Sequence, residues 1–122
     1  SNIVVRLFHF CFCLVYCFSS WRPEQDGILL LDDCRYVLEG YNKQLKELTC
    51  LEPLHDTEKE YFPMMMGAAC QYLINWCTTL FFYEDPDLVN DYEALYYLLH
   101  ITRLMDWIED HKEDLAKVIK DV

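Results

Sequence analysis

The apolar residues of this chain fall into stretches whose lengths and spacings predict helices. Residues 3–19 are apolar on every side except at Arg6 and His9. The stretch is too long for a typical strand and suits a helix of four to five turns, which would be buried around most of its circumference. The Trp21-Arg22-Pro23 step is expected to end it.

A second stretch, from about residue 23 to residue 49, alternates apolar and polar positions. Its apolar positions are spaced by three and four residues, at Leu31, Cys34, Leu38, Tyr41, Leu45 and Leu48. This spacing predicts an amphipathic helix with one packed stripe and one solvated face. Gly40 lies within it at a cost of about 1 kcal/mol relative to Ala, which close approach of a neighbouring helix would offset.

The third helix is expected to follow a long connection, residues 50–62. Thr57 and Glu60 have the spacing of a capping box, which allows one helical turn there. Pro63 suits the first position of a helix, where its missing N–H does no harm. Residues 64–82 carry few polar side chains and predict the central, most buried helix.

The C-terminal part predicts one or two further helices. Asp85 before Pro86 favours a helix that begins at Pro86, since Asp caps first-turn amides and Pro presets φ. A polar break at residues 109–112 separates it from a last apolar stripe, at Leu115, Val118, Ile119 and Val122. No Pro or Gly enforces that break, so one long helix is the alternative.

These elements predict an all-α fold: a compact bundle of four to five mostly antiparallel helices in a single domain, residues 1–122. The chain contains three Gly and four Pro, too few turn residues for a sandwich of many short strands. The alternative is a fragment of an α-solenoid, for which five segments of this length would also serve.

The net charge of −11 indicates which kinds of partner the protein can bind. Residues 1–50 carry five basic and six acidic side chains, whereas residues 51–122 carry five and fifteen. An acidic surface argues against binding nucleic acid or an anionic membrane, and it favours a basic protein partner. We expect no nucleic-acid and no membrane partner.

Seven cysteines in 122 residues form no recognisable disulfide framework. We expect reduced thiols and a cytoplasmic protein, with Cys11, Cys13, Cys17, Cys70 and Cys77 packed in the core. Residues 6–20 also have the order of features of a secretory signal: Arg6, an apolar run, then two serines. We expect this segment to belong to the fold instead, and it is too short to span a bilayer.

Candidate chemistry in the sequence is weak. His9, Cys13 and Cys17 share one helical stripe, but a structural zinc site normally pairs two short knuckles, and there is no second pair. His100 lies among apolar residues and is interpreted as a core or boundary residue. There is no nucleophile motif and no glycine-rich phosphate loop. We therefore expect no catalytic residues, no metal and no cofactor, and hence no enzyme.

The remaining hypothesis is a non-enzymatic protein-interaction module. The chain has more aromatic residues near 83–107 than a core of this size needs, and aromatic residues with polar tips are favoured at interfaces. The predicted partner-binding residues are Tyr83, Glu84, Asp87, Asp91, Tyr92, Tyr96, Tyr97 and Trp107. The partner is a protein, with a basic one favoured, or a second copy in a homodimer. The alternatives are an acidic inhibitor or antagonist of a basic protein site, and a scaffold fragment of a larger protein.

Overall fold

A computed structural model describes residues 2–48 and 52–122, with side chains described from residue 6 onward. In this part of the chain the structure has five α-helices and no strand longer than an isolated bridge. The helices are α1 (Asn2–Cys17), α2 (Leu31–Glu47), α3 (Asp56–Thr79), α4 (Asp91–Asp110) and α5 (Lys112–Lys120). The predicted all-α helical bundle is confirmed.

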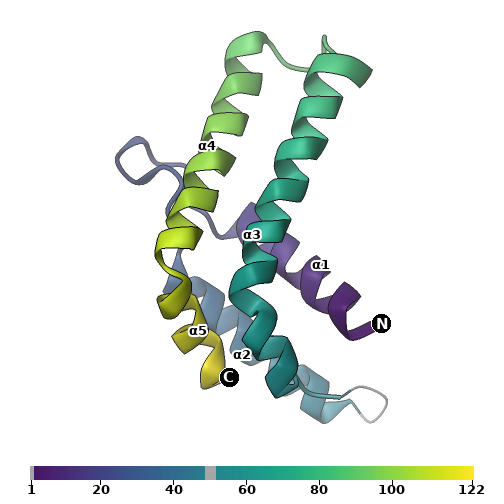
Figure 1. The fold of residues 1–122 in the computed structure, drawn as a ribbon, viewed down its shortest axis with the longest axis vertical. Helices are drawn as coiled ribbons and strands as arrows, with labels where there is room; N and C mark the ends of the chain where they lie inside the picture. Colours follow the sequence, from purple (N-terminus) through teal and green to yellow (C-terminus); the bar gives the residue numbers. More distant parts are fainter. Residues whose placement is uncertain (1, 49–51) are drawn as a thin grey trace.

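The central helix is α3, which contacts α1, α4 and α5, while α2 packs on α5. Figure 1 shows α3 and α4 as a long antiparallel hairpin, with α1 crossing α3 and the short α5 beside the start of α3. In a solenoid each repeat contacts only its neighbours in sequence. Here α2 packs on α5, although α3 and α4 separate them in the chain, so the arrangement is that of a bundle.

The core draws one buried stripe from each helix. Its fully buried members include Cys11, Leu14, Leu38, Phe62, Met66, Ala69, Leu104, Ile108 and Leu115. Burial of this apolar surface supplies the main stabilising free energy of the bundle.

The prediction that α1 is buried around most of its circumference is wrong. Leu7, Cys11, Leu14 and Val15 form a single buried stripe, and the opposite face of the helix is exposed at His9, Cys13, Tyr16 and Cys17. The reason is position: α1 lies at the edge of the bundle, against one side of α3. The apolar composition of α1 therefore leaves uncharged side chains on the surface.

The second helix begins at Leu31, later than predicted, because residues 18–30 form a folded loop. The N–H of Ser20 donates to Ile28 O (2.8 Å), and the N–H of Leu30 donates to Phe18 O (2.8 Å). A short 3₁₀ turn, η1 (Pro23–Gln25), closes the loop's end.

The third helix begins at Asp56, so the prediction that Pro63 opens it is wrong. The N–H of His55 donates to Glu58 Oε1 (3.0 Å), a cap that starts the helix before Pro63 is reached. Pro63 lies inside α3, where it cannot donate to the preceding turn. After Thr79 the helix continues as a π-helical turn, η2 (Leu80–Glu84).

The fourth helix begins at Asp91 rather than at Pro86. Asn90 caps it, since Asn90 Oδ1 accepts from the N–H of Glu93 (2.8 Å). The chain needs the intervening residues to reverse direction before α4 can pack on α3. The predicted polar break is real: α4 and α5 are separate helices that meet at His111.

None of the described helices is both long enough and apolar enough to cross a membrane.

Candidate functional site

Most of the predicted partner-binding residues lie around the far end of the α3–α4 hairpin, drawn in green in Figure 1. Tyr83 and Glu84 lie in η2, Asp87 in the connection, Asp91 and Tyr92 in the first turn of α4, and Tyr96 and Tyr97 in the next turn. All seven are exposed. Tyr92 is 87% exposed and Tyr83 78% exposed, so both rings stand almost free of the protein.

Trp107 lies apart from this group. It is eleven positions beyond Tyr96 in α4, about 16 Å along the helix axis. Its ring stacks on His111 with the ring centroids 3.9 Å apart, and its carbonyl accepts from His111 Nδ1–H (2.7 Å). Trp107 thus packs at the junction between α4 and α5.

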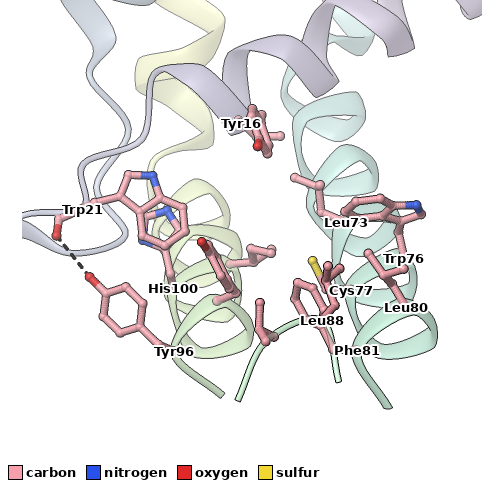
Figure 2. A pocket seen from close by; sticks show the side chains of 14 residues that line it. Tyr16, Trp21, Leu73, Trp76, Cys77, Leu80, Phe81, Leu88, Tyr96 and His100 are labelled. Atoms are coloured by element: carbon pink, nitrogen blue, oxygen red, sulfur yellow. Dashed lines mark hydrogen bonds between the residues drawn. The ribbon is translucent and has the colours of Figure 1, made fainter. Parts of the chain in front are cut away.

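An apolar groove opens between α3 and α4, beneath the end of α1. Its volume is about 570 Å³. Figure 2 shows its two walls: Trp21, Tyr96 and His100 on one side and Leu73, Trp76, Cys77 and Leu80 on the other, with Tyr16 and Leu88 at its ends. Tyr96 and Tyr97 are the two predicted residues that line it.

A second hollow, of about 380 Å³, extends this groove between α1 and α3. It is lined by Phe12, Tyr16, Tyr72, Leu73 and Trp76, and three of these, Tyr16, Leu73 and Trp76, also line the first hollow. The two hollows are therefore parts of one apolar groove. Tyr16 is 62% exposed and Trp76 50% exposed, so large apolar groups face solvent at its centre.

The loop of residues 18–30 forms one wall of the groove and is held firmly on α4. Trp21 stacks on the His100 ring with centroids 3.4 Å apart, and Tyr96 Oη donates to the Trp21 carbonyl (3.2 Å). Gly27 has a φ of +82°, and a Cβ there would lie 2.6 Å from Arg103 Cβ. The loop packs this closely on α4 because residue 27 has no side chain.

A buried polar trio fixes the same loop. His100 Nδ1 lies 2.9 Å from Asp26 Oδ1, and His100 Nε2 lies 2.9 Å from Ser19 Oγ. Arg103 Nη1 donates to the other carboxylate oxygen of Asp26 (2.8 Å). Both ring nitrogens of His100 are thus partnered, as a side chain only 1% exposed requires.

Burial determines the charge state of this trio. Burial lowers the pKa of His100 below its ordinary value and outweighs Asp26, which raises it. Burial alone would raise the pKa of Asp26, but the hydrogen bonds from His100 and Arg103 hold that pKa below its usual range. With the imidazole neutral, Nδ1–H donates to the Asp26 carboxylate, and Nε2 accepts from the Ser19 hydroxyl, whose single proton is shared with the Val15 carbonyl 3.0 Å away.

A serine hydroxyl hydrogen-bonded to a histidine, which is in turn hydrogen-bonded to an aspartate, is the arrangement that activates a serine nucleophile in hydrolases. The surroundings differ from those of an active site, however. Ser19 is 5% exposed, it does not line the groove, and Trp21 covers a face of the His100 ring. A substrate carbonyl must come within about 3 Å of the nucleophile, whereas Ser19 is almost completely buried. The trio acts as a clamp between the loop and α4.

The thiols divide into two groups. Cys11, Cys70 and Cys77 are buried as predicted, and burial raises the pKa of Cys70 to about 12. Cys13 and Cys17 are exposed on the outer face of α1, so their assignment to the core is wrong. Among the residues that the structure describes, no group of His, Cys, Asp and Glu is placed to hold a metal ion, and His9, Cys13 and Cys17 form none.

Sequence patterns did not reveal the groove residues Tyr16, Trp21 and Trp76, or Asp26, which holds the loop on α4. Tyr16 was assigned to a buried helix, and Trp76 to the central helix. A usable signal was the neighbourhood of Trp76, where Gln71 and Asn75 mark a solvent-facing side of α3. Asp26 had no local signal, since its partners lie more than seventy positions away in the chain.

Comparisons of this chain with protein-family models, with curated proteins and with solved structures found no match. The groove and its surroundings are therefore the features from which a function can be inferred.

Proposed function

We propose that this protein is a non-enzymatic interaction module that binds a helical segment of another protein in the apolar groove between α1, α3 and α4. The observation that carries the proposal is the exposure of large apolar groups along one continuous groove. Tyr16, Tyr72, Trp76 and Leu88 are each half exposed or more. Monomeric proteins rarely leave contiguous apolar patches of this kind uncovered unless they bind something.

The shape of the groove favours a helix as the bound segment. Two hollows of about 570 and 380 Å³ follow one another along α3 and are joined at Tyr16, Leu73 and Trp76. An amphipathic helix presents apolar anchors at i, i+3, i+4 and i+7, which fit successive hollows of a groove. Aromatic residues such as Trp and Tyr are the usual anchors of protein interfaces.

Two further points belong to this proposal. A cytoplasmic location is supported by the free thiols among the described cysteines, which reducing compartments maintain. Binding without catalysis is supported by the burial of Ser19, the residue whose hydroxyl meets His100. A homodimer is less favoured, because two copies that each carry a charge of −11 repel one another.

The test is selection of binders from a displayed library of random helical peptides, with the whole chain as bait. The selected peptides are then measured against two variants. Trp76→Ser removes an aromatic ring from the centre of the groove, while Tyr36→Ser removes one from the exposed face of α2, where Tyr36 is 79% exposed. Both positions are exposed enough for the fold to tolerate the change, which circular dichroism verifies.

We expect Trp76→Ser to weaken binding about tenfold or more, as for an interface hot spot, and Tyr36→Ser to leave it unchanged. Equal effects of the two variants, or a failure to select any peptide that Trp76→Ser weakens, would overturn the proposal.

A further inference from the structure

The hairpin that forms the groove has a one-sided charge distribution. Residues 60–102, which include most of α3, η2 and more than half of α4, contain no Lys and no Arg. They contain six carboxylates, all exposed: Glu60, Glu84, Asp85, Asp87, Asp91 and Glu93. The only basic side chain in this span is His100, which is buried and hydrogen-bonded to Asp26.

Five of those carboxylates gather at one place. Glu84, Asp85, Asp87, Asp91 and Glu93 lie where η2, the connection and the start of α4 meet, and we call this region the acidic end of the groove. None of them takes part in an ion pair in the described part of the chain. The nearest arginine along α4, Arg103, is committed to Asp26.

The acidic end is continuous with the groove. Leu88 and Val89 line the groove and stand in the chain between Asp87 and Asp91. Figure 2 shows Leu88 and Phe81 at this end, while Tyr16 marks the opposite end, towards α1. Beyond Tyr16 the groove is lined by uncharged residues, including Phe12 and Tyr72. The walls of the groove are therefore apolar along its length, and a cluster of carboxylates stands beside one end of it.

We propose that the occupant of the groove is an amphipathic helix of another protein with Lys or Arg side chains on the terminal turn that lies over the acidic end. The inference rests on the proposed function and adds the chemistry and orientation of the partner. Apolar anchors would enter between Trp76 and Tyr96, and the basic turn would meet carboxylates that have no cation of their own. Complementary charge also orients the helix, because reversing it would move the basic turn to the uncharged end.

Charge argues against the two other occupants that an apolar groove attracts. A second copy of this chain brings a charge of −11 and no basic residue within 60–102. An anionic lipid surface is repelled by the same carboxylates. Both stay as measurable outcomes of the test.

The experiment uses the peptides selected on the whole chain. We expect the binders that Trp76→Ser weakens to be enriched in Lys and Arg at one end. Their affinity should fall at least about threefold between low and high salt, because exposed charges are screened. The double variant Asp87→Asn/Asp91→Asn should weaken binding by a similar factor, and should remove most of the salt dependence.

The matched control is Glu113→Gln/Asp114→Asn, which removes two exposed carboxylates from the first turn of α5, away from the groove. We expect it to leave affinity and salt dependence nearly unchanged. A peptide labelled at its basic end should crosslink to residues 84–93, and one labelled at the other end should crosslink near Tyr72.

Groove binders without basic residues, or equal effects of the two double variants, would overturn this inference and leave the proposed function standing. A dimer in native mass measurements that Trp76→Ser dissociates would overturn it in favour of a second copy. Binding to phosphatidylserine vesicles that Trp76→Ser abolishes would overturn it in favour of a lipid surface. If no selected peptide is weakened by Trp76→Ser, both the proposed function and this inference are wrong.

Discussion

Gly27 shows how a single residue permits the loop of residues 18–30 to dock on α4. Its φ of +82° is unfavourable for any residue with a side chain, and a Cβ there would lie 2.6 Å from Arg103 Cβ and 3.1 Å from the backbone nitrogen of Leu104. The helix backbone cannot move away without disturbing Leu104, which is fully buried. Strain and clash therefore act together at this position.

We expect Gly27→Ala to lower the free energy of unfolding by at least about 1–3 kcal/mol, the cost of a strained backbone conformation, with the clash in addition. Urea denaturation followed by circular dichroism measures this. The loop should also loosen, which would appear as an increase in solvent exposure of Trp21 in fluorescence. An unchanged unfolding midpoint would show that the loop does not pack on α4 as described.

Gly40 provides the opposite case within a helix. A Cβ at Gly40 would meet nothing within 4 Å, so no neighbouring helix approaches this position closely enough to offset the cost of Gly. Ala loses less conformational freedom on folding than Gly, and we expect Gly40→Ala to raise the free energy of unfolding by about 0.5–1 kcal/mol. The same urea experiment checks it. A destabilising Gly40→Ala would mean that a neighbour covers this face of α2.

The candidate site was only partly predictable at the level of residues. Tyr96 and Tyr97 were predicted to bind a partner because aromatic residues were in surplus, and they line the groove. Whether they bind a partner stays a prediction. The trio was not predictable, since Ser19, Asp26 and His100 come together only through tertiary packing. Sequence spacing carries no information about contacts between a loop and a helix that far apart.

At the level of elements, α1 is fastened to α3 by a largely buried ion pair. Arg6 donates from Nε to Glu58 Oε2 (2.8 Å) and from a second nitrogen to Oε1, and it also donates to the carbonyls of Glu52 and Pro53. Glu58 is 1% exposed and receives the N–H of His55 as well. One carboxylate therefore both caps α3 and holds α1 against it.

We expect Glu58→Gln to destabilise the protein by about 2 kcal/mol. This is less than the roughly 3–5 kcal/mol lost when a fully buried pair is broken, because the Arg6 side chain remains 22% exposed. The control is Glu109→Gln, which breaks the solvent-exposed pair with Lys112 and should have almost no effect. Thermal unfolding of both variants tests this, and equal shifts in Tm would contradict the role given to Glu58.

The helices themselves were largely predictable, whereas their starts were not. Periodicity identified α2 and α5, and the polar break at residues 109–112 matches the junction at His111. The starts of α3 and α4 were misplaced because Pro63 and Pro86 are favourable first residues in isolation. The actual starts depend on Glu58, which Arg6 positions from another helix, and on Asn90, which lies where the chain has finished reversing.

At the level of the whole molecule, the chain has more apolar side chains than its five described helices can cover. Residues 6–17 of α1 contain one charged side chain, yet α3 covers α1 along a single stripe. A bundle of this size has too few helices to cover every apolar face. Composition therefore predicted a buried first helix, and the structure instead exposes Tyr16 and contributes it to the groove.

The whole molecule should also be sensitive to acid, because three buried groups have pKa values below their ordinary values. Burial lowers the pKa of His100 from 6.5. Burial would raise the pKa of Glu58, but hydrogen bonds from Arg6 and the His55 N–H lower it below 4.5. Burial would also raise the pKa of Asp26, but hydrogen bonds from His100 and Arg103 lower it below 3.8. In each case the unfolded chain binds a proton at a higher pH than the folded protein does.

The sign follows from this difference: a group whose pKa is lower in the folded state contributes stability that is complete above its unfolded pKa and is lost as the pH falls through its folded pKa. We expect the free energy of unfolding to be nearly constant from pH 8 to 7. It should then decline as the pH falls below 6.5, because the unfolded chain protonates His100 before the folded protein does. The decline should steepen below pH 4.5, where the same holds for Glu58 and then for Asp26.

His100→Gln separates the first part of this decline from the second, because Gln keeps two hydrogen-bonding groups and does not titrate. Its unfolding free energy, measured by urea denaturation at each pH, should lose the slope that sets in below pH 6.5 and keep the slope below pH 4.5. As the pH falls, the net negative charge becomes smaller and repulsion weakens in the wild-type protein and in His100→Gln alike. The difference between their two curves therefore isolates His100. Parallel curves would show that His100 is not the group whose protonation loosens the wall of the groove.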